Sequence, residues 1–170
     1  MKRLLAPLVH TVIAAAAWGA LLPAWALDPP KGKVILTLYG KLGERNRVDT
    51  AVFDMAMLEK LPQHSFTTSS PWDALPTKYT GPLLRDILAA AKARGRTVHA
   101  QGLNDYRTAI PLDDAYKYPL IVAHHMDDRP IPVRTKGPLF IMYPFDAHAA
   151  LRSVRYYERS VWQLKSLTVE

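Results

Sequence analysis

The sequence has 170 residues, with 22 Lys or Arg against 15 Asp or Glu, so its formal net charge is +7 at pH 7. It has no cysteine, which excludes disulfide bonds, thiolate-bound zinc, iron–sulfur clusters and redox chemistry at a thiol. No run of like charge is longer than two, so the basic residues indicate a solvated surface, or a few cations that meet a small anionic ligand or partner, rather than a nucleic-acid-binding domain.

The first 26 residues have the organisation of a secretory signal peptide. Lys2 and Arg3 give a basic start, residues 4–22 are almost entirely apolar, and Ala24-Trp25-Ala26 has the small residues that a signal peptidase recognises. We therefore expect cleavage after Ala26 and a mature domain of residues 27–170 in the periplasm.

An uncleaved membrane anchor is the alternative, because an apolar run of about 19 residues nearly spans a bilayer. Pro7 and Pro23 interrupt this run and favour cleavage. No other stretch is long and apolar enough to span, so the mature protein is expected not to be embedded in the membrane. N-terminal sequencing of the exported protein distinguishes the two forms.

The first half of the mature chain predicts one strand, two helices and irregular segments. The expected elements, in order, are a strand over Val34–Tyr39, a polar turn over Lys41–Asn46, a helix over Met55–Leu61 capped by Asp54 and ended by Pro62, a short β-like segment over Phe66–Ser70, and a loop over Pro71–Tyr79. The strongest helix is expected over Leu83–Ala93, with its apolar residues on one face and Gly95 as its terminator.

The second half predicts mostly strands joined by tight turns. The expected elements are strands over Val98–Leu103 and Tyr106–Pro111 around the turn Asn104-Asp105, strands over Leu120–Met126 and Arg129–Val133 around the turn Asp127-Asp128, a buried strand over Leu139–Tyr143, a short helix over Ala149–Tyr157 and a final strand over Val161–Val169. This order predicts a mixed, strand-rich α+β domain with a few short helices rather than alternating βαβ units.

Several segments resemble a known family when taken together. Gly81-Pro82-Leu83-Leu84-Arg85-Asp86 is similar to a "G-x-x-L-R-D-L-L" helix, Asn104-Asp105-Tyr106 to a "D-G-Y" turn, and Arg129–Pro144 to a "G-x-P-L-x…G-P-L…P" segment. Val34–Gly40, Phe53–Leu61 and Trp162–Val169 resemble the first strand, the first helix and the closing strand of the same pattern. The pattern is that of the molybdopterin-binding domain of sulfite-oxidase-type oxidoreductases, and the resemblance implies that fold.

The chain departs from this family at the residue that binds the metal. The family ties molybdenum to a cysteine thiolate after the strand that follows the first helix, where this chain has Phe66-Thr67-Thr68-Ser69-Ser70. A serine hydroxyl is a harder ligand of much higher pKa, so Ser69 and Ser70 are expected to close a polar loop rather than to hold a metal. We therefore expect no metal, no catalytic residues and no molybdenum-dependent turnover.

The resemblance implies a pterin as ligand, and a pterin calls for aromatic faces and polar edge readers. Rings are expected from Trp72, Tyr106, Tyr156, Tyr157 and Trp162, and edge recognition from Asn104 and Asp105. Cations for a phosphate or side-chain tail are expected from Arg134, Lys136, Arg155 and Arg159.

The histidines show no metal-ligand spacing, and no G-x-S-x-G motif supports a Ser-His-Asp triad. His124 and His125 are adjacent in an expected strand and therefore point to opposite faces.

Three functions remain open. The resemblance and the missing thiolate favour a small periplasmic pterin-binding protein that has lost redox chemistry and reports to a membrane signalling partner, such as a cyclic-di-GMP enzyme; the size of the mature chain, too small for the further modules of family enzymes, agrees with this. The alternative is a small molybdopterin-dependent oxidoreductase subunit whose protein ligand to the metal is unusual or absent. The third is an exported interaction module with no small ligand.

Overall fold

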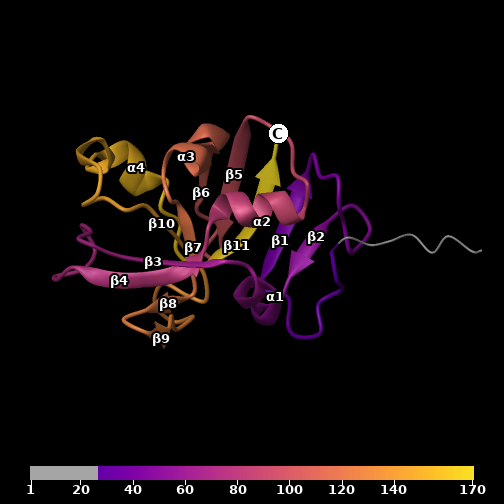
Figure 1. The fold of residues 1–170 in the computed structure, drawn as a ribbon, viewed down its shortest axis with the longest axis horizontal. Coiled ribbons are helices and arrows are strands. Elements are labelled where there is room, and N and C mark those ends of the chain that lie inside the picture. Colours follow the sequence, from indigo (N-terminus) through magenta and orange to yellow (C-terminus); the bar gives the residue numbers. More distant parts are fainter. Residues whose placement is uncertain (1–26) are drawn as a thin grey trace, which may run out of the picture.

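The computed structural model describes residues 27–170, so the expected signal peptide lies outside the described residues. Its architecture is α+β and strand-rich, as predicted, with three sheets and short helices around one core (Figure 1). Within residues 27–170, no helix is long and apolar enough to cross a membrane.

The largest sheet has five strands and contains the first and the last strand of the described chain. Its strands, in spatial order, are β2 (Ala51–Phe53), β1 (Leu36–Gly40), β11 (Leu164–Val169), β5 (Thr97–Gly102) and β6 (Arg107–Pro111). β1 and β11 pair in parallel, and the other neighbours are antiparallel. Because β11 pairs with β1, the closing segment lies in the middle of the sheet.

The remaining strands form two smaller sheets. A four-stranded sheet consists of β3 (Gln63–Thr68), β4 (Thr77–Pro82), β8 (His125–Met126) and β9 (Arg129–Pro130), and a two-stranded sheet consists of β10 (Phe140–Met142) and β7 (Ile121–Ala123). The helices are α1 (Met55–Lys60), α2 (Leu84–Ala90), α3 (Leu112–Lys117) and α4 (Val154–Glu158), with a 3-10 turn at Ala149–Leu151.

Residue pattern explains the main packing. Leu36 and Leu38 of β1 are fully buried, while Thr37 and Tyr39 between and beyond them face the other side of the sheet. The apolar stripe of α2 joins the same core, because Leu84, Ile87 and Leu88 are buried. As predicted, α1 begins at Asp54, whose carboxylate accepts a hydrogen bond from the Met57 N–H at 2.9 Å.

The predicted tight turns also form. Asp127 and Asp128 have φ values of 49° and 60°, which is the left-handed conformation that a two-residue hairpin requires. Asp105 has a φ of 62°, so it takes the unusual backbone angles expected where the family pattern has glycine.

The helix α2 ends earlier than predicted, and Gly95 is not its terminator. Lys92 adopts a left-handed φ of 45°, the Lys92 N–H donates to Ala89 O, and the Ala93 N–H donates to Leu88 O. These two bonds form a Schellman motif, which satisfies the last carbonyls of the helix with a lysine where glycine is usual.

Several other boundaries were wrong. Residues 77–82 form β4 rather than a loop and helix start, and β2 and α3 were not predicted. The expected strand over residues 120–126 is divided into β7 and β8, which belong to different sheets. The expected helix over residues 149–157 is divided into a 3-10 turn and α4, and β9 and β11 are shorter than expected.

Candidate functional site

A cavity of about 330 Å³ is walled by four aromatic rings that come from three separate parts of the chain. Trp72 lies between β3 and β4, Tyr106 precedes β6, and Tyr157 and Trp162 flank the connection from α4 to β11. Its polar lining consists of Asn104, Glu158 and Ser160. We call this the aromatic cavity.

Trp72 holds the rings of the aromatic cavity in fixed orientations. Its ring lies 5.8 Å from that of Trp162 at 89° and 5.9 Å from that of Tyr157 at 79°, both in edge-to-face contact. It also meets Phe140 and Phe145 of the core. Edge-to-face packing of this kind leaves few alternative rotamers, so the rings of the cavity walls are held in place before any ligand binds.

The turn between β5 and β6 positions the fourth ring. The Asn104 Oδ1 atom accepts a hydrogen bond from the Tyr106 N–H at 3.1 Å, and the Tyr106 hydroxyl donates to the Glu158 carbonyl oxygen at 2.8 Å. Burial raises the pKa of Tyr106, and the charge of Glu158 raises it further, so this hydroxyl remains a donor at neutral pH.

Five of the eleven residues expected to bind a pterin line this cavity, namely Trp72, Asn104, Tyr106, Tyr157 and Trp162. Asp105 does not. Its carboxylate pairs with Lys165 at 2.8 Å and accepts a hydrogen bond from Gln101 at 2.9 Å, and both partners lie on the five-stranded sheet.

The cations expected to meet a phosphate are placed elsewhere. Lys136 forms a largely buried ion pair with Asp73, and its ammonium lies 5.6 Å from the centroid of the Trp162 ring. Arg159 pairs with Asp114 at 2.8 Å, in a cluster where the Tyr143 hydroxyl donates to the same carboxylate. Arg134 is exposed in the loop before β10 and does not line the cavity.

Tyr156 also packs away from the aromatic cavity. Its ring contacts Tyr118 at 5.9 Å and Tyr143 at 5.4 Å, and the Arg159 guanidinium lies 5.3 Å from its centroid. The neighbouring Tyr157 is the ring that faces the cavity, as expected for adjacent residues of a helix that point about 100° apart.

Ser69 and Ser70, which the resemblance places where the family has its cysteine, line a second, adjoining hollow of about 530 Å³ that also contacts Tyr157. The Ser69 N–H donates to an Asp146 carboxylate oxygen at 2.6 Å, and the Ser70 hydroxyl donates to Asp73 at 2.8 Å. Among the described residues, no three His, Asp or Glu side chains form a metal-binding group. The side-chain oxygens of this hollow belong to Ser69, Ser70 and Asp146, and none of them is the soft thiolate by which the family ties molybdenum to the protein.

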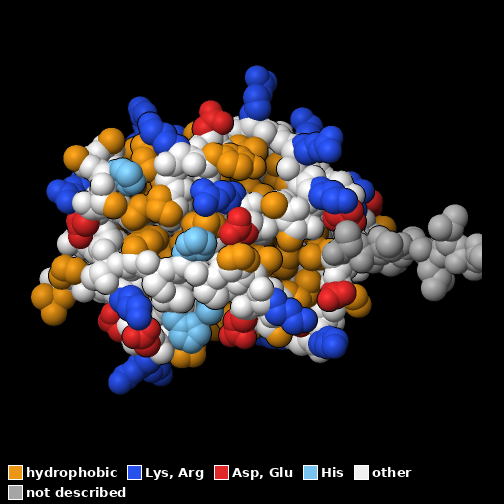
Figure 2. All heavy atoms as spheres, viewed as in Figure 1, with side chains coloured by type: hydrophobic (Ala, Val, Ile, Leu, Met, Phe, Trp, Pro, Cys, Tyr) orange, Lys and Arg blue, Asp and Glu red, His pale blue; other side chains and the backbone are white. Residues whose placement is uncertain are grey.

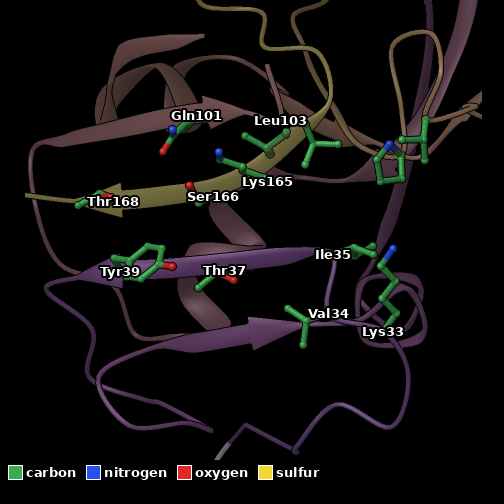
Figure 3. Close-up of a pocket in the computed structure, with 13 residues that line it drawn as sticks. Lys33, Val34, Ile35, Thr37, Tyr39, Gln101, Leu103, Lys165, Ser166 and Thr168 are labelled. Carbon is green, nitrogen blue, oxygen red and sulfur yellow. The ribbon is translucent and has the colours of Figure 1, made fainter. Parts of the chain in front are cut away.

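A third hollow, of about 440 Å³, lies on the face of the five-stranded sheet that carries Thr37 and Tyr39 (Figure 3). Figure 3 shows short hydroxyl side chains of β1 and β11 across its floor, with Gln101 and Lys165 above them. Of the described residues that line this hollow, Tyr39 alone has an aromatic ring, so the hollow offers little stacking surface. The charged side chains on the face of the molecule in Figure 2 are mixed in sign and do not form one patch.

Comparison with known proteins agrees with this fold. The family model "Oxidoreductase molybdopterin binding domain" matches residues 45–160. The chain belongs to this family. Among solved structures, the sulfane dehydrogenase SoxCD from Paracoccus pantotrophus is similar, with a TM-score of 0.61 and 14% sequence identity over 79% of this chain. The match covers 37% of the SoxCD chain, and no curated protein matches.

Sequence reasoning missed Glu158 and Ser160 as lining residues. Rings at Tyr156, Tyr157 and Trp162 mark this segment as a candidate wall, and the polar residues between those rings were the available signal. Whether Glu158 and Ser160 face the cavity depends on where α4 ends, and the sequence pattern did not predict that boundary.

Proposed function

We propose that this protein is a periplasmic, non-catalytic pterin-binding protein that reports to a membrane signalling partner such as a cyclic-di-GMP enzyme. The observation that carries the proposal is the aromatic cavity, which offers four rings to a flat heterocycle in a molybdopterin-binding family member that has no cysteine. A pterin stacks on such rings and meets Asn104, Glu158 and Ser160 at its polar edges.

The alternative of a small molybdopterin-dependent oxidoreductase subunit draws on family membership. Metal analysis of protein purified from its native compartment separates the two. Stoichiometric molybdenum supports the enzyme, whereas a bound fluorescent pterin without metal supports the sensor. The signalling role is tested separately, by measuring cyclic-di-GMP in cells that lack this protein, with and without its re-expression.

Pterin binding is tested at Tyr106, an exposed ring whose removal disturbs little of the core. We expect Tyr106→Ala to weaken the binding of 6-hydroxymethylpterin about 10- to 100-fold, since stacking on one aromatic side chain is worth about 1–3 kcal/mol. Isothermal titration calorimetry measures the affinity.

Tyr39→Ala is the matched control. Tyr39 is 44% exposed and Tyr106 is 42% exposed, but Tyr39 lies in the sheet hollow of Figure 3. Equal affinities of Tyr106→Ala and the wild type would exclude the aromatic cavity as the binding site.

A further inference from the structure

We propose that Glu158 and Asn104 together read the donor–donor–acceptor edge of a pterin and make the aromatic cavity selective for 2-amino pteridines over their 2-oxo analogues. This inference rests on the proposed pterin-binding function and deepens it. It replaces Asp105, the edge reader expected from the sequence, with a residue at the end of α4.

Among residues 27–170, Glu158 is the only charged residue that lines the aromatic cavity. The other carboxylates near the expected site are already paired: Asp73 with Lys136, Asp105 with Lys165, and Asp114 with Arg159. Within residues 27–170, the carboxylate of Glu158 has neither an ion pair nor a hydrogen bond. It is therefore an acceptor group available to a ligand.

The backbone of Glu158 is fixed at the cavity wall. Its carbonyl oxygen accepts the Tyr106 hydroxyl at 2.8 Å, which joins the end of α4 to the turn between β5 and β6. The effect of the Glu158 charge on the pKa of Tyr106 agrees with a carboxylate close to that hydroxyl. The negative charge thus lies beside one of the rings on which a heterocycle would stack.

Asn104 supplies the complementary donor. Its Oδ1 atom accepts the Tyr106 N–H, so its amide nitrogen is the atom left for a ligand, and among the described residues that nitrogen has no hydrogen-bond partner. The cavity therefore presents a charged acceptor and a neutral donor from two segments that the Tyr106–Glu158 hydrogen bond ties together.

This pair matches one edge of a pterin. The 2-amino group and N3–H of the ring are parallel donors, which a carboxylate accepts in a bidentate arrangement, and the adjoining 4-oxo group is an acceptor for the Asn104 amide. A lumazine has a 2-oxo group where a pterin has the amine, so it loses one donor and places an oxygen against the Glu158 carboxylate. The lumazine therefore binds more weakly, because it lacks one hydrogen bond and its 2-oxo group is repelled by the Glu158 carboxylate.

The experiment compares 6-hydroxymethylpterin with 6-hydroxymethyl-lumazine by calorimetry on the mature protein. We expect the wild type to bind the pterin about 10- to 100-fold more tightly, the difference that one charge-assisted hydrogen bond makes. Glu158→Gln is expected to abolish or reverse this preference, because the amide nitrogen of glutamine donates to a 2-oxo group. Asp113→Asn removes an exposed carboxylate of α3 outside the cavity and is the charge-matched control, expected to keep the preference.

The outcomes separate the inference from the function it rests on. If the wild type binds no pterin, the proposed function fails and the inference fails with it. If the wild type binds pterin and Glu158→Gln keeps the preference, pterin binding stands and the role of Glu158 is excluded. If Asp105→Asn loses the preference for the pterin while Glu158→Gln keeps it, the edge of the pterin is recognised by the β5–β6 turn instead.

Discussion

Single polar residues behind the aromatic cavity fix the rings that form its walls. The Asp73 carboxylate accepts hydrogen bonds from the Ser70 hydroxyl at 2.8 Å and the Tyr79 hydroxyl at 2.7 Å, and it pairs with Lys136. Lys136 in turn places its ammonium near the Trp162 ring. A residue expected to hold a phosphate thus has a different role in the structure, since its charge is neutralised and it packs against a cavity wall.

Asp73→Asn is expected to lower the free energy of unfolding at pH 7 by about 1–3 kcal/mol, because it leaves the largely buried Lys136 ammonium without a counter-charge. Burial acts to raise the pKa of Asp73, but hydrogen bonds from Lys136, Tyr79 and Ser70 outweigh it, and the pKa lies below its usual 3.8. The stabilisation is therefore complete above the unfolded pKa of about 3.8 and is lost as the pH falls through the lower folded value. Urea unfolding at several pH values measures both effects. Variant and wild-type stabilities that coincide at pH 7 would exclude this role.

At the scale of elements, the sequence pattern correctly predicted those features that depend only on residues close together in the chain. The apolar stripe of α2, the cap at Asp54 and the turn at Asp127-Asp128 all follow from neighbouring residues. The strand β4 was missed because its segment follows prolines and does not alternate clearly, and its pairing with β3 comes from tertiary contacts.

In the candidate site too, ring positions could be predicted from the sequence, whereas contacts between distant residues could not. Some of the residues expected to bind a pterin line the cavity, namely Trp72, Asn104, Tyr106, Tyr157 and Trp162. The partners of Lys136 and Arg159 lie 63 and 45 residues away, at Asp73 and Asp114. Neither ion pair follows from local pattern, so the sequence did not separate cations held in the structure from cations available to a ligand.

One hydrogen-bonded chain connects the four-stranded sheet to the end of α1. The Gln63 side-chain amide donates to the Leu58 and Leu61 carbonyls, so its Oε1 atom accepts from the His124 Nε2–H at 2.8 Å. The remaining ring nitrogen of His124 then accepts from His125 Nδ1 at 2.6 Å, so the prediction that the two rings point to opposite faces was wrong. This arrangement requires a neutral His124.

We expect the protein to lose stability as the pH falls below about 6.5, because burial, and after it the charge of His125, lowers the pKa of His124. The unfolded chain binds a proton at His124 in a pH range where the folded chain does not, so the free energy of unfolding decreases toward low pH, by at most about 1.4 kcal/mol per pH unit for one proton. His124→Gln should flatten this dependence in denaturant titrations between pH 7.5 and 5, while His64→Gln should not. An unchanged slope in His124→Gln would assign the pH dependence to other groups.

At the scale of the whole molecule, the protein has one core, no cysteine in its sequence and a cavity whose walls come from segments far apart in the chain. A ligand in the aromatic cavity contacts the β5–β6 turn, the segment between β3 and β4, and the connection from α4 to β11 at the same time. Binding therefore stabilises contacts between segments that separate when the chain unfolds.

A bound pterin is accordingly expected to stabilise the entire domain. At a free concentration one hundred times its Kd, it should raise the free energy of unfolding by about 2.7 kcal/mol, which corresponds to an increase in Tm of roughly 5–10 °C for a domain of this size. Sodium molybdate alone should leave Tm unchanged, because the sequence has no cysteine and so offers no thiolate to hold molybdenum. Thermal unfolding with each compound, and with both together, measures these effects. A further increase in Tm when molybdate is added to the pterin complex would support the oxidoreductase alternative, and no increase with any pterin would contradict the proposed function.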